Sequence, residues 1–390
     1  MSGPWDVVVV GARVAGAATA MLLARGGLDV LCLDRAPAGA DTTSTHALMR
    51  AGVLQLTRWG LLAEVVAAGT PPVRRSVFHH GNRTQTVTIR PRAGVDALYA
   101  PRRTVIDPLL VAAARDAGAT VEHGAKVRGL IRSATGRVEG VTVRTRDGRV
   151  REERARLVVG ADGLGSLVAR EAGAAVRWRG QAASDWVYTY APLEADDYEW
   201  FYGDGRSGGV IPTNDGLACV FTGGRPDTMS EALEQHGQDA WDWLPKTAEL
   251  ALRTEGRIGS HPLRHVRGTP AVLRRAVGDG WVLVGDAGSW KDPLSTHGMT
   301  DAMRDAELLS RAVLAWSGGD RDALGGYEDL RDRLTLPLLE ATEPLAAHRW
   351  GPATTPDLVR ALASAMADEV DVLLTLDEVG VPDAAASTSV

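Results

Sequence analysis

The chain has 390 residues, of which 45% are hydrophobic and 24% charged, a composition typical of ordinary soluble globular proteins. This length exceeds what one compact core accommodates, so two substructures and an appendage are expected. The formal net charge of −6 gives no basic patch for nucleic acid or anionic lipid, and only two cysteines, Cys32 and Cys219, exclude a disulfide framework.

The first predicted element is a buried strand at Asp6–Val10, a β-branched run of the kind found in parallel sheets. An alanine- and leucine-rich helix follows and ends at the glycine pair 26–27. A second apolar strand, Leu28–Leu33, finishes on Asp34. The largely apolar stretch 7–24 has no basic segment before it and is interrupted by Arg13. We therefore expect no signal peptide and no membrane span. The low cysteine content suits a cytoplasmic protein.

The turn between the first strand and the helix reads GARVAG, residues 11–16. In a dinucleotide-binding unit Gly11 would make the tight turn, Gly16 would let the helix pack on the strand, and the helix N-terminus would face a pyrophosphate. Arg13 replaces the usual second glycine, yet its N–H can still point inward while its side chain adds a cation. A different β-α-β protein or a degenerate turn stays open at this stage. The candidate cofactor-binding residues of this unit are Gly11, Arg13, Ala15, Gly16, Asp34 and Arg35.

Three later segments carry further signals. Residues 100–111, APRRTVIDPLLV, begin an amphipathic helix, in which Asp107 could simply serve the helix N-terminus. Residues 157–171 form a buried strand that runs into Asp162-Gly163, a common turn sequence. Residues 281–316 give a strand, Gly285-Asp286, a proline loop and a long helix with apolar side chains at helical spacing.

The order of these motifs resembles the FAD-dependent monooxygenases of the para-hydroxybenzoate hydroxylase type, over roughly residues 5–335. The resemblance implies an α/β fold: a Rossmann-like, GR2-type FAD-binding domain, an inserted antiparallel β-sheet substrate domain and a C-terminal helical segment. It also implies that the first unit binds the ADP half of FAD and that Arg103, or its neighbour Arg102, lies by the phosphates and ribityl chain. The remaining cofactor-binding residues implied by the resemblance are Asp162, Gly163, Gly285, Asp286, Pro293, Gly298 and Met299.

Such a fold predicts a discontinuous FAD domain made of residues 5–72, 97–178 and 266–318, with a β-meander near 126–156. Residues 73–96 and 179–265 would form the substrate sheet, and 319–390 a helical segment ending in a disordered tail, PDAAASTSV.

Aromatic residues are concentrated in the predicted substrate sheet. Trp186, Tyr188 and Tyr190 have the period-two spacing that puts them on one face of a strand. A sheet face packed on its own core is the plainer interpretation for any one of them. Together they would form an aromatic wall for a flat, apolar substrate. The candidate substrate residues are Trp186, Tyr188, Trp200, Tyr202 and Pro212.

The implied chemistry is insertion of one oxygen atom from O2 through a flavin C4a-hydroperoxide, with NADPH or NADH as reductant. Such a site excludes water and requires little acid–base machinery. His297, just before the long helix, and His46, after the second strand, are candidate catalytic residues, although either could equally satisfy loop backbone groups. No metal site is expected, because acidic or cysteine partners at ligand spacing are not evident.

Other flavin functions share these motifs. A dehydrogenase or a C=C reductase of the geranylgeranyl-reductase type is the main alternative. A halogenase is a weaker one, prompted by Trp241 and Trp243 before Pro245 in a stretch, 230–252, that otherwise predicts an amphipathic helix. A non-catalytic flavin-binding protein is the third. The expected substrate is an aromatic natural product, the expected state is a monomer or homodimer, and a separate flavin reductase remains a possible partner.

Overall fold

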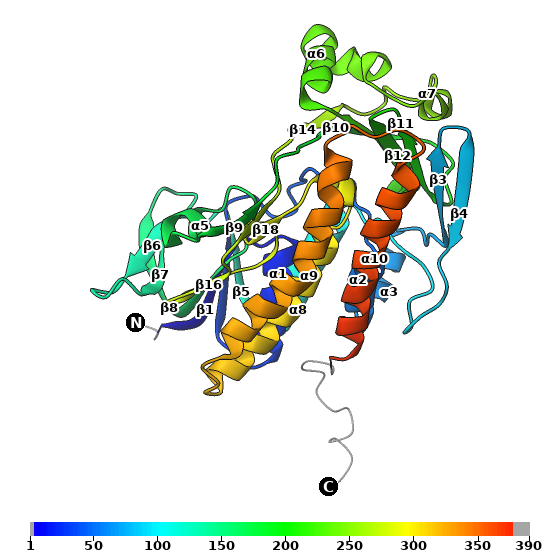
Figure 1. Cartoon of the computed structure of the whole chain (residues 1–390). Coiled ribbons are helices and arrows are strands. Elements are labelled where there is room, and N and C mark those ends of the chain that lie inside the picture. Colours follow the sequence, from blue (N-terminus) through cyan, green and yellow to red (C-terminus); the bar gives the residue numbers. More distant parts are fainter. Residues whose placement is uncertain (1–3, 377–390) are drawn as a thin grey trace.

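The valine-rich run of β1 (Trp5–Val10) lies inside an eight-stranded sheet in a computed structural model that describes residues 4–376 (Figure 1). It pairs in parallel with β2 on one side and β8 on the other. The order is β16-β17-β8-β1-β2-β5, and β6 and β7 extend from β8 as the predicted antiparallel meander. The other strands are β2 (Val30–Asp34), β5 (Thr120–His123), β6 (Lys126–Arg132), β7 (Val138–Arg144), β8 (Val150–Gly160), β16 (Val277–Gly278) and β17 (Trp281–Leu283).

Helices cover this sheet. α1 packs against both α4 and α8, and α2 packs against α8. The alanine-rich sequence of α1 is buried over most of its length, because small side chains let it lie close to the strands. The parallel sheet with its covering helices confirms the predicted Rossmann-like α/β fold. The helices are α1 (Val14–Arg25), α2 (Arg50–Arg58), α3 (Leu62–Ala67), α4 (Arg103–Asp116), α5 (Leu167–Ala172) and α8 (Gly298–Ser317).

A second sheet of seven strands has the order β14-β10-β13-β12-β11-β3-β4. The sheet is antiparallel, as predicted, except for one pair, because β3 runs parallel to β11. No hairpin joins these two strands, which come from distant parts of the chain, so nothing imposes the antiparallel direction. The strands are β3 (Arg75–His80), β4 (Arg83–Thr88), β10 (Asp185–Ala191), β11 (Tyr198–Gly203), β12 (Arg206–Pro212), β13 (Ala218–Gly224) and β14 (Arg264–Val266).

The stretch 230–252 was expected to form one amphipathic helix. It forms three elements instead: α6, the 3-10 turn η2 and α7. Gly237 ends α6 with φ +54, a conformation that favours glycine. Trp241 is buried and Trp243 is exposed, so only one of the paired tryptophans belongs to the core. The elements not named so far are α6 (Pro226–His236), η2 (Gly237–Trp243), α7 (Ala248–Thr254), a small sheet of β9 (Val176–Arg179), β15 (Val272–Arg274) and β18 (Ser289–Trp290), and the short turns η1 (Asn214–Gly216), η3 (Gly285–Ala287) and η4 (Pro293–Ser295).

Two helices, α9 (Ala323–Ala346) and α10 (Thr355–Leu374), form the predicted C-terminal helical segment. α9 packs on α8, and α10 packs on α9 and α2, so this segment lies against the first sheet's helical layer (Figure 1). Among the helices of residues 4–376, none combines the length and apolar character needed to cross a bilayer. The predicted disordered tail lies outside the described residues.

Candidate active site

A cavity of about 560 Å3 lies where the carboxyl ends of β1, β2 and β8 meet strand β10 and the N-terminus of α8. Segments from residue 10 to residue 302 contribute to its wall. Parallel sheets bind ligands at this edge, because the loops that follow the strands converge there. The predicted cofactor-binding residues on the wall are Gly11, Arg13, Ala15, Asp34, Arg35, Arg103, Asp162, Gly163, Asp286, Pro293, Gly298 and Met299.

Two other predicted glycines, Gly16 and Gly285, lie behind the wall and act by close packing. A Cβ on Gly16 would lie 1.8 Å from the carbonyl oxygen of Gly11, and a Cβ on Gly285 would lie 3.0 Å from the Cβ of Ala15. Gly11 itself has φ +105, and its Cβ would meet the Ala161 carbonyl oxygen at 2.4 Å. The turn therefore has no room for side chains at Gly11 and Gly16.

The N-terminus of α1 is free to bind an anion. Arg13 occupies the cap position but accepts no hydrogen bond from the first turn, so the leading N–H groups of the helix point outward without a side-chain acceptor. The Arg13 guanidinium lies 3.3 Å from a carboxylate oxygen of Asp107. Arg103 binds the same carboxylate with two hydrogen bonds of 2.9 Å. A helix N-terminus flanked by two arginines fits a pyrophosphate.

The first of the two candidate arginines, Arg102, turns away from the cavity. Its guanidinium lies 4.4 Å from the centre of the Tyr190 ring and 3.3 Å from Asp215. Only Arg103 of this pair is on the wall.

Asp34 holds the glycine turn together. Its carboxylate accepts hydrogen bonds from the backbone N–H of Ala12 at 2.8 Å and of Ala36 at 2.7 Å. Each carboxylate oxygen has a further lone pair, so the group can also accept from a ribose hydroxyl. Asp162 has a mainly local role, since it accepts from Ser166 and from the Leu167 N–H at the start of α5.

Asp286 differs from both other aspartates, because no described residue donates a hydrogen bond to its carboxylate, which is on the cavity wall. Burial raises the pKa of Asp286 to about 6, although Lys291 nearby opposes this shift. A lone acceptor in this position fits the hydroxyl of a bound ribityl chain. Taken together, the glycine turn, the arginines and Asp286 fit FAD.

Two residues of the loop before α8, Lys291 and Asp292, hold it in place through buried polar contacts. Asp292 accepts hydrogen bonds from the Ser184 backbone N–H at 2.8 Å and from its hydroxyl at 2.5 Å, which ties the loop to the start of β10. Lys291, 5% exposed, forms an ion pair of 2.7 Å with Asp301 of α8. The first turn of α8 is thereby held against the cavity with its positive end inward.

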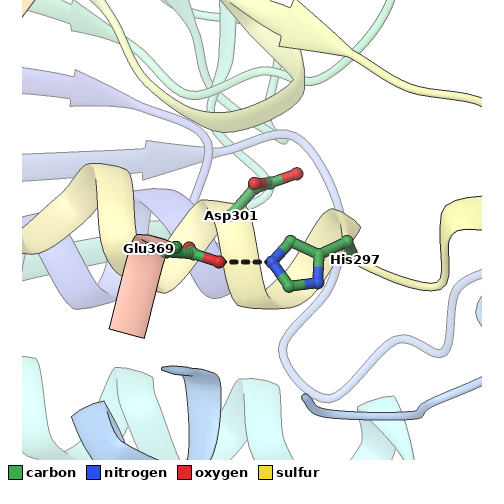
Figure 2. Close-up of side chains that lie close together, drawn as sticks. All are labelled: His297, Asp301 and Glu369. Carbon is green, nitrogen blue, oxygen red and sulfur yellow. Dashed lines mark hydrogen bonds and ion pairs between the residues drawn. The ribbon is translucent and has the colours of Figure 1, made fainter. Parts of the chain in front are cut away.

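Both predicted catalytic histidines line the cavity, and both are 1% exposed. The Nε2 of His46 lies 2.5 Å from the hydroxyl of Tyr190, and the Nε2 of His297 lies 2.5 Å from a carboxylate oxygen of Glu369 on α10 (Figure 2). In each ring the buried Nδ1 has no partner among the described residues. Burial, with Arg103 and Arg102 nearby, lowers the pKa of His46 to about 3, so His46 is neutral.

The expectation that His297 has no acidic neighbours is wrong. Asp301 follows four residues later on α8, Glu369 comes from α10, and one ligand atom from each of the three lies within 4.8 Å of the others (Figure 2). These carboxylates already have cationic partners, because Arg304 contacts Asp301 at 2.8 Å and Glu369 at 3.4 Å, and Lys291 binds Asp301. A metal ion would have to displace these cations, so the cluster is an ion-pair network.

The predicted substrate residues on β10 line the cavity, and those on β11 and β12 do not. Trp186 and Tyr188 of β10 line the cavity together with Trp290. Trp200, Tyr202 and Pro212 are not on its wall; Trp200 and Tyr202 belong to the hydrophobic core. The reason is the strand order, because β11 and β12 are separated from β10 by β13.

Four residues near the site were not predicted as site residues: Tyr190, Lys291, Asp292 and Glu369. The period-two aromatic pattern pointed to Tyr190 only as part of a wall, and Lys291-Asp292 adjoin the predicted Pro293 loop. Nothing in the sequence around Glu369 connects it with His297, which is 72 positions away.

Comparison with known proteins gives a concordant result. The sequence model of a family described as FAD binding domain matches residues 4–339. Digeranylgeranylglycerophospholipid reductase 1 of Methanopyrus kandleri is 32% identical over 347 residues, which cover 83% of this chain and 85% of that protein. Among solved structures, the flavin-dependent brominase Bmp2 has a TM-score of 0.78 at 18% identity, covering 95% of this chain and 98% of that one. PqsL of Pseudomonas aeruginosa, a probable FAD-dependent monooxygenase, has a TM-score of 0.75 at 22% identity, covering 94% and 100%. At these identities the structural matches show a shared fold.

Proposed function

This chain belongs to the FAD binding domain family and is a FAD-dependent oxidoreductase, and from that premise we propose that it reduces a carbon–carbon double bond in an apolar small molecule. The observation that carries the proposal is the pair of oriented histidines on the cavity wall, His46 and His297. Bound FAD, once reduced by NADPH, NADH or another donor, supplies a hydride. Reduction of a double bond also requires a proton at the second carbon, and oxygen insertion does not.

Two groups of side chains could supply that proton: the pair of Tyr190 and His46, and His297. Tyr190 has a hydroxyl in hydrogen-bond contact with His46, and a neutral imidazole can receive a proton on one nitrogen while releasing one from the other. The second ring nitrogen of His297 has no hydrogen-bond partner within residues 4–376. Burial raises the pKa of Tyr190 well above its ordinary value, so its hydroxyl stays protonated until a proton is drawn from it.

The remaining site residues hold the reactants. Arg13, Arg103 and the N-terminus of α1 would bind the pyrophosphate, and Asp286 the ribityl chain. Trp186, Tyr188 and Trp290 line the cavity and would present an apolar face from which a bound substrate excludes water. The similarity to a digeranylgeranylglycerophospholipid reductase, at 32% identity, supports a substrate with isolated double bonds.

The second candidate is the NAD(P)H-dependent monooxygenase implied by the family resemblance. The aromatic wall favours it, because a flat aromatic substrate would stack on Trp186 and Trp290. In this alternative O2 is a substrate, and the histidines orient the substrate or satisfy the loop.

One experiment separates the two reactions. The yellow protein is reduced without oxygen, then mixed with geranylgeranyl diphosphate, a menaquinone analogue or aromatic compounds, while flavin absorbance and product mass are followed. We expect anaerobic reoxidation with a product that gains two hydrogens. Reoxidation that depends on oxygen, with oxygen-18 in the product, would establish the monooxygenase instead.

A further inference from the structure

We propose that Glu369, on the C-terminal helix α10, is a positioning residue that keeps the proton of the neutral His297 ring on Nε2, and so leaves Nδ1 as the atom that exchanges protons at the cavity. The proposal deepens the proposed function and rests on it for the identity of the proton acceptor. The tautomer itself does not depend on which reaction the site performs.

The first support is geometric. His297 precedes the first residue of α8 and lines the cavity, with its Nε2 2.5 Å from the Oε2 of Glu369 (Figure 2). Both side chains are almost completely buried, at 1% and 0% exposure. A bond of this length inside the protein fixes the ring, because rotation would leave the buried Oε2 of Glu369 without its hydrogen-bond donor. The ring's other nitrogen, Nδ1, has no partner among the described residues.

The second support is the charge of Glu369. Its Oε1 lies 3.4 Å from the guanidinium of Arg304, which is fully buried. A permanent cation at this distance keeps a carboxylate ionised. An ionised carboxylate is only an acceptor, so the hydrogen atom in the short contact belongs to Nε2 of His297.

The third support is the charge balance around the ring. The charged groups of this buried network are Lys291 on the loop, Asp301, Arg304 and Asp305 on α8, and Glu369 on α10. Three carboxylates face two permanent cations, which leaves one negative charge, so a positive charge on the His297 ring brings the network to neutrality. The ring can therefore take up a second proton on Nδ1 without leaving a net buried charge.

A balanced proton transfer follows from this arrangement. The Nδ1–H bond of the imidazolium breaks as the proton moves to the substrate carbon next to the one that has received the hydride. The bonding electron pair stays on Nδ1, and the ring returns to the neutral form with its proton on Nε2. The hydrogen bond to Glu369 is kept throughout, and a proton from solvent restores the imidazolium.

The test is a direct reading of the tautomer in the oxidised FAD-loaded protein. The histidines are labelled with nitrogen-15, long-range proton–nitrogen correlation spectra are recorded at alkaline pH, and the His297 signals are assigned by their loss in His297→Asn. We expect one neutral tautomer, with the proton on Nε2. In Glu369→Gln we expect both tautomers, because an amide offers an acceptor and a donor to Nε2 alike.

The matched control is Asp305→Asn. It also removes a carboxylate from Arg304 but does not touch His297, so the single Nε2–H tautomer should persist. Thermal unfolding and near-ultraviolet circular dichroism establish that each variant is folded. If Glu369→Gln does not fold, the test rests on the tautomer of the wild-type protein and on that of Glu369→Asp. Glu369→Asp keeps the carboxylate and should keep the proton on Nε2.

A proton on Nδ1 in the wild-type protein would overturn the proposal, and so would a single Nε2–H tautomer in folded Glu369→Gln. These spectra need no substrate. An Nε2–H ring in a protein that reduces no double bond would therefore refute the proposed function and leave the role of Glu369 intact.

Discussion

The Nε2 of His46 and the hydroxyl oxygen of Tyr190 are 2.5 Å apart, and the two rings stack with centroids 5.6 Å from each other. His46 adopts this position with φ +68, in the left-handed region that a histidine seldom occupies. Such a backbone is retained only where the surroundings enforce it. The loop after β2 therefore places this ring against strand β10 of the second sheet.

Replacing Tyr190 by Phe removes the hydroxyl and keeps the ring. We expect FAD binding to be retained and turnover to fall by about a hundredfold or more, since a positioned proton donor contributes on that scale. Steady-state kinetics with the flavin content matched between samples measure the effect. Tyr202→Phe is the control, because Tyr202 is buried in the same sheet but takes no part in the hydrogen bond between His46 and Tyr190. An equal loss in both variants would attribute the effect to sheet packing.

Gly16→Ala tests the close contact in the glycine turn. Its Cβ would lie 1.8 Å from the Gly11 carbonyl oxygen, and overpacking of this kind costs about 1–3 kcal/mol. We expect FAD affinity to fall roughly tenfold to a hundredfold, measured by flavin fluorescence titration of the FAD-free protein. Gly325→Ala, in the first turn of α9 with nothing within 4 Å of the added Cβ, should leave FAD affinity unchanged and stabilise the protein by up to about 1 kcal/mol. Unaltered FAD binding by Gly16→Ala would contradict the turn's proposed role.

The carboxyl group of Asp286 predicts a pH-dependent stability. Its pKa is about 6 in the folded protein and 3.8 when unperturbed, so between these values the folded state binds the extra proton. Its contribution to stability is present below about pH 4 and is lost as pH rises through 6. Without FAD, Asp286→Asn should therefore have a higher melting temperature than the wild type at pH 8. The difference in melting temperature should become smaller as the pH falls to 5. A difference that is constant between pH 5 and 8 would exclude a raised pKa.

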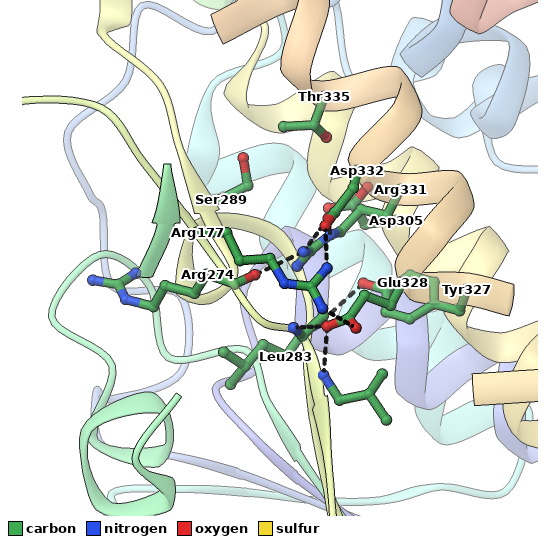
Figure 3. Close-up of polar contacts among 12 residues, drawn as sticks. Arg177, Arg274, Leu283, Ser289, Asp305, Tyr327, Glu328, Arg331, Asp332 and Thr335 are labelled. Atoms are coloured by element: carbon green, nitrogen blue, oxygen red, sulfur yellow. Dashed lines mark hydrogen bonds and ion pairs between the residues drawn. The ribbon is translucent and has the colours of Figure 1, made fainter. Parts of the chain in front are cut away.

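Glu328 on α9 binds the backbone at the start of β16, the edge strand of the first sheet. One carboxylate oxygen accepts from the backbone N–H of Ala276 at 2.5 Å and of Val277 at 3.2 Å, and the other binds Arg177 at 2.6 Å (Figure 3). Glu328→Ala leaves two N–H groups without an acceptor, and we expect the free energy of unfolding to fall by about 1–3 kcal/mol.

Urea denaturation measures that loss. Arg360→Ala breaks an ion pair with Asp357 whose side chains are 75% and 77% exposed, so it should change the free energy by no more than about 1 kcal/mol. Similar losses in the two variants would show that Glu328 contributes no more than a surface charge.

Much of the fold was predictable because its signals are local. The run Val7–Val10, the glycine turn and Asp34 lie within 30 residues and specify strand, turn, helix and strand by themselves. The break at Gly237 and the parallel pairing of β3 with β11 depend on which neighbours are available in the folded chain. Period two correctly put Trp186, Tyr188 and Tyr190 on one face, but it carries no information on strand order, which decided that Trp200 and Tyr202 lie in the core.

The site was predictable to the extent that its residues belong to contiguous motifs. Asp301 lies one helical turn after His297, so helical spacing could have identified it as a partner. Glu369 reaches the same ring from another helix, through packing of α10 that no short pattern encodes. The division of the chain into FAD and substrate segments remains a prediction.

The placement of β1 between β2 and β8 has a consequence for synthesis on the ribosome. The partner residues on β8 emerge about 150 positions after those of β1, which at about 5–20 residues per second is roughly 8–30 s. Throughout this interval the nascent chain carries a valine strand with one open edge, a surface that invites pairing with other chains. The cavity wall is completed later still, when Ala302 has emerged. Flavin loading is thus a late, nearly post-translational event, and chaperone supply during translation should limit the yield of folded protein more than flavin supply does.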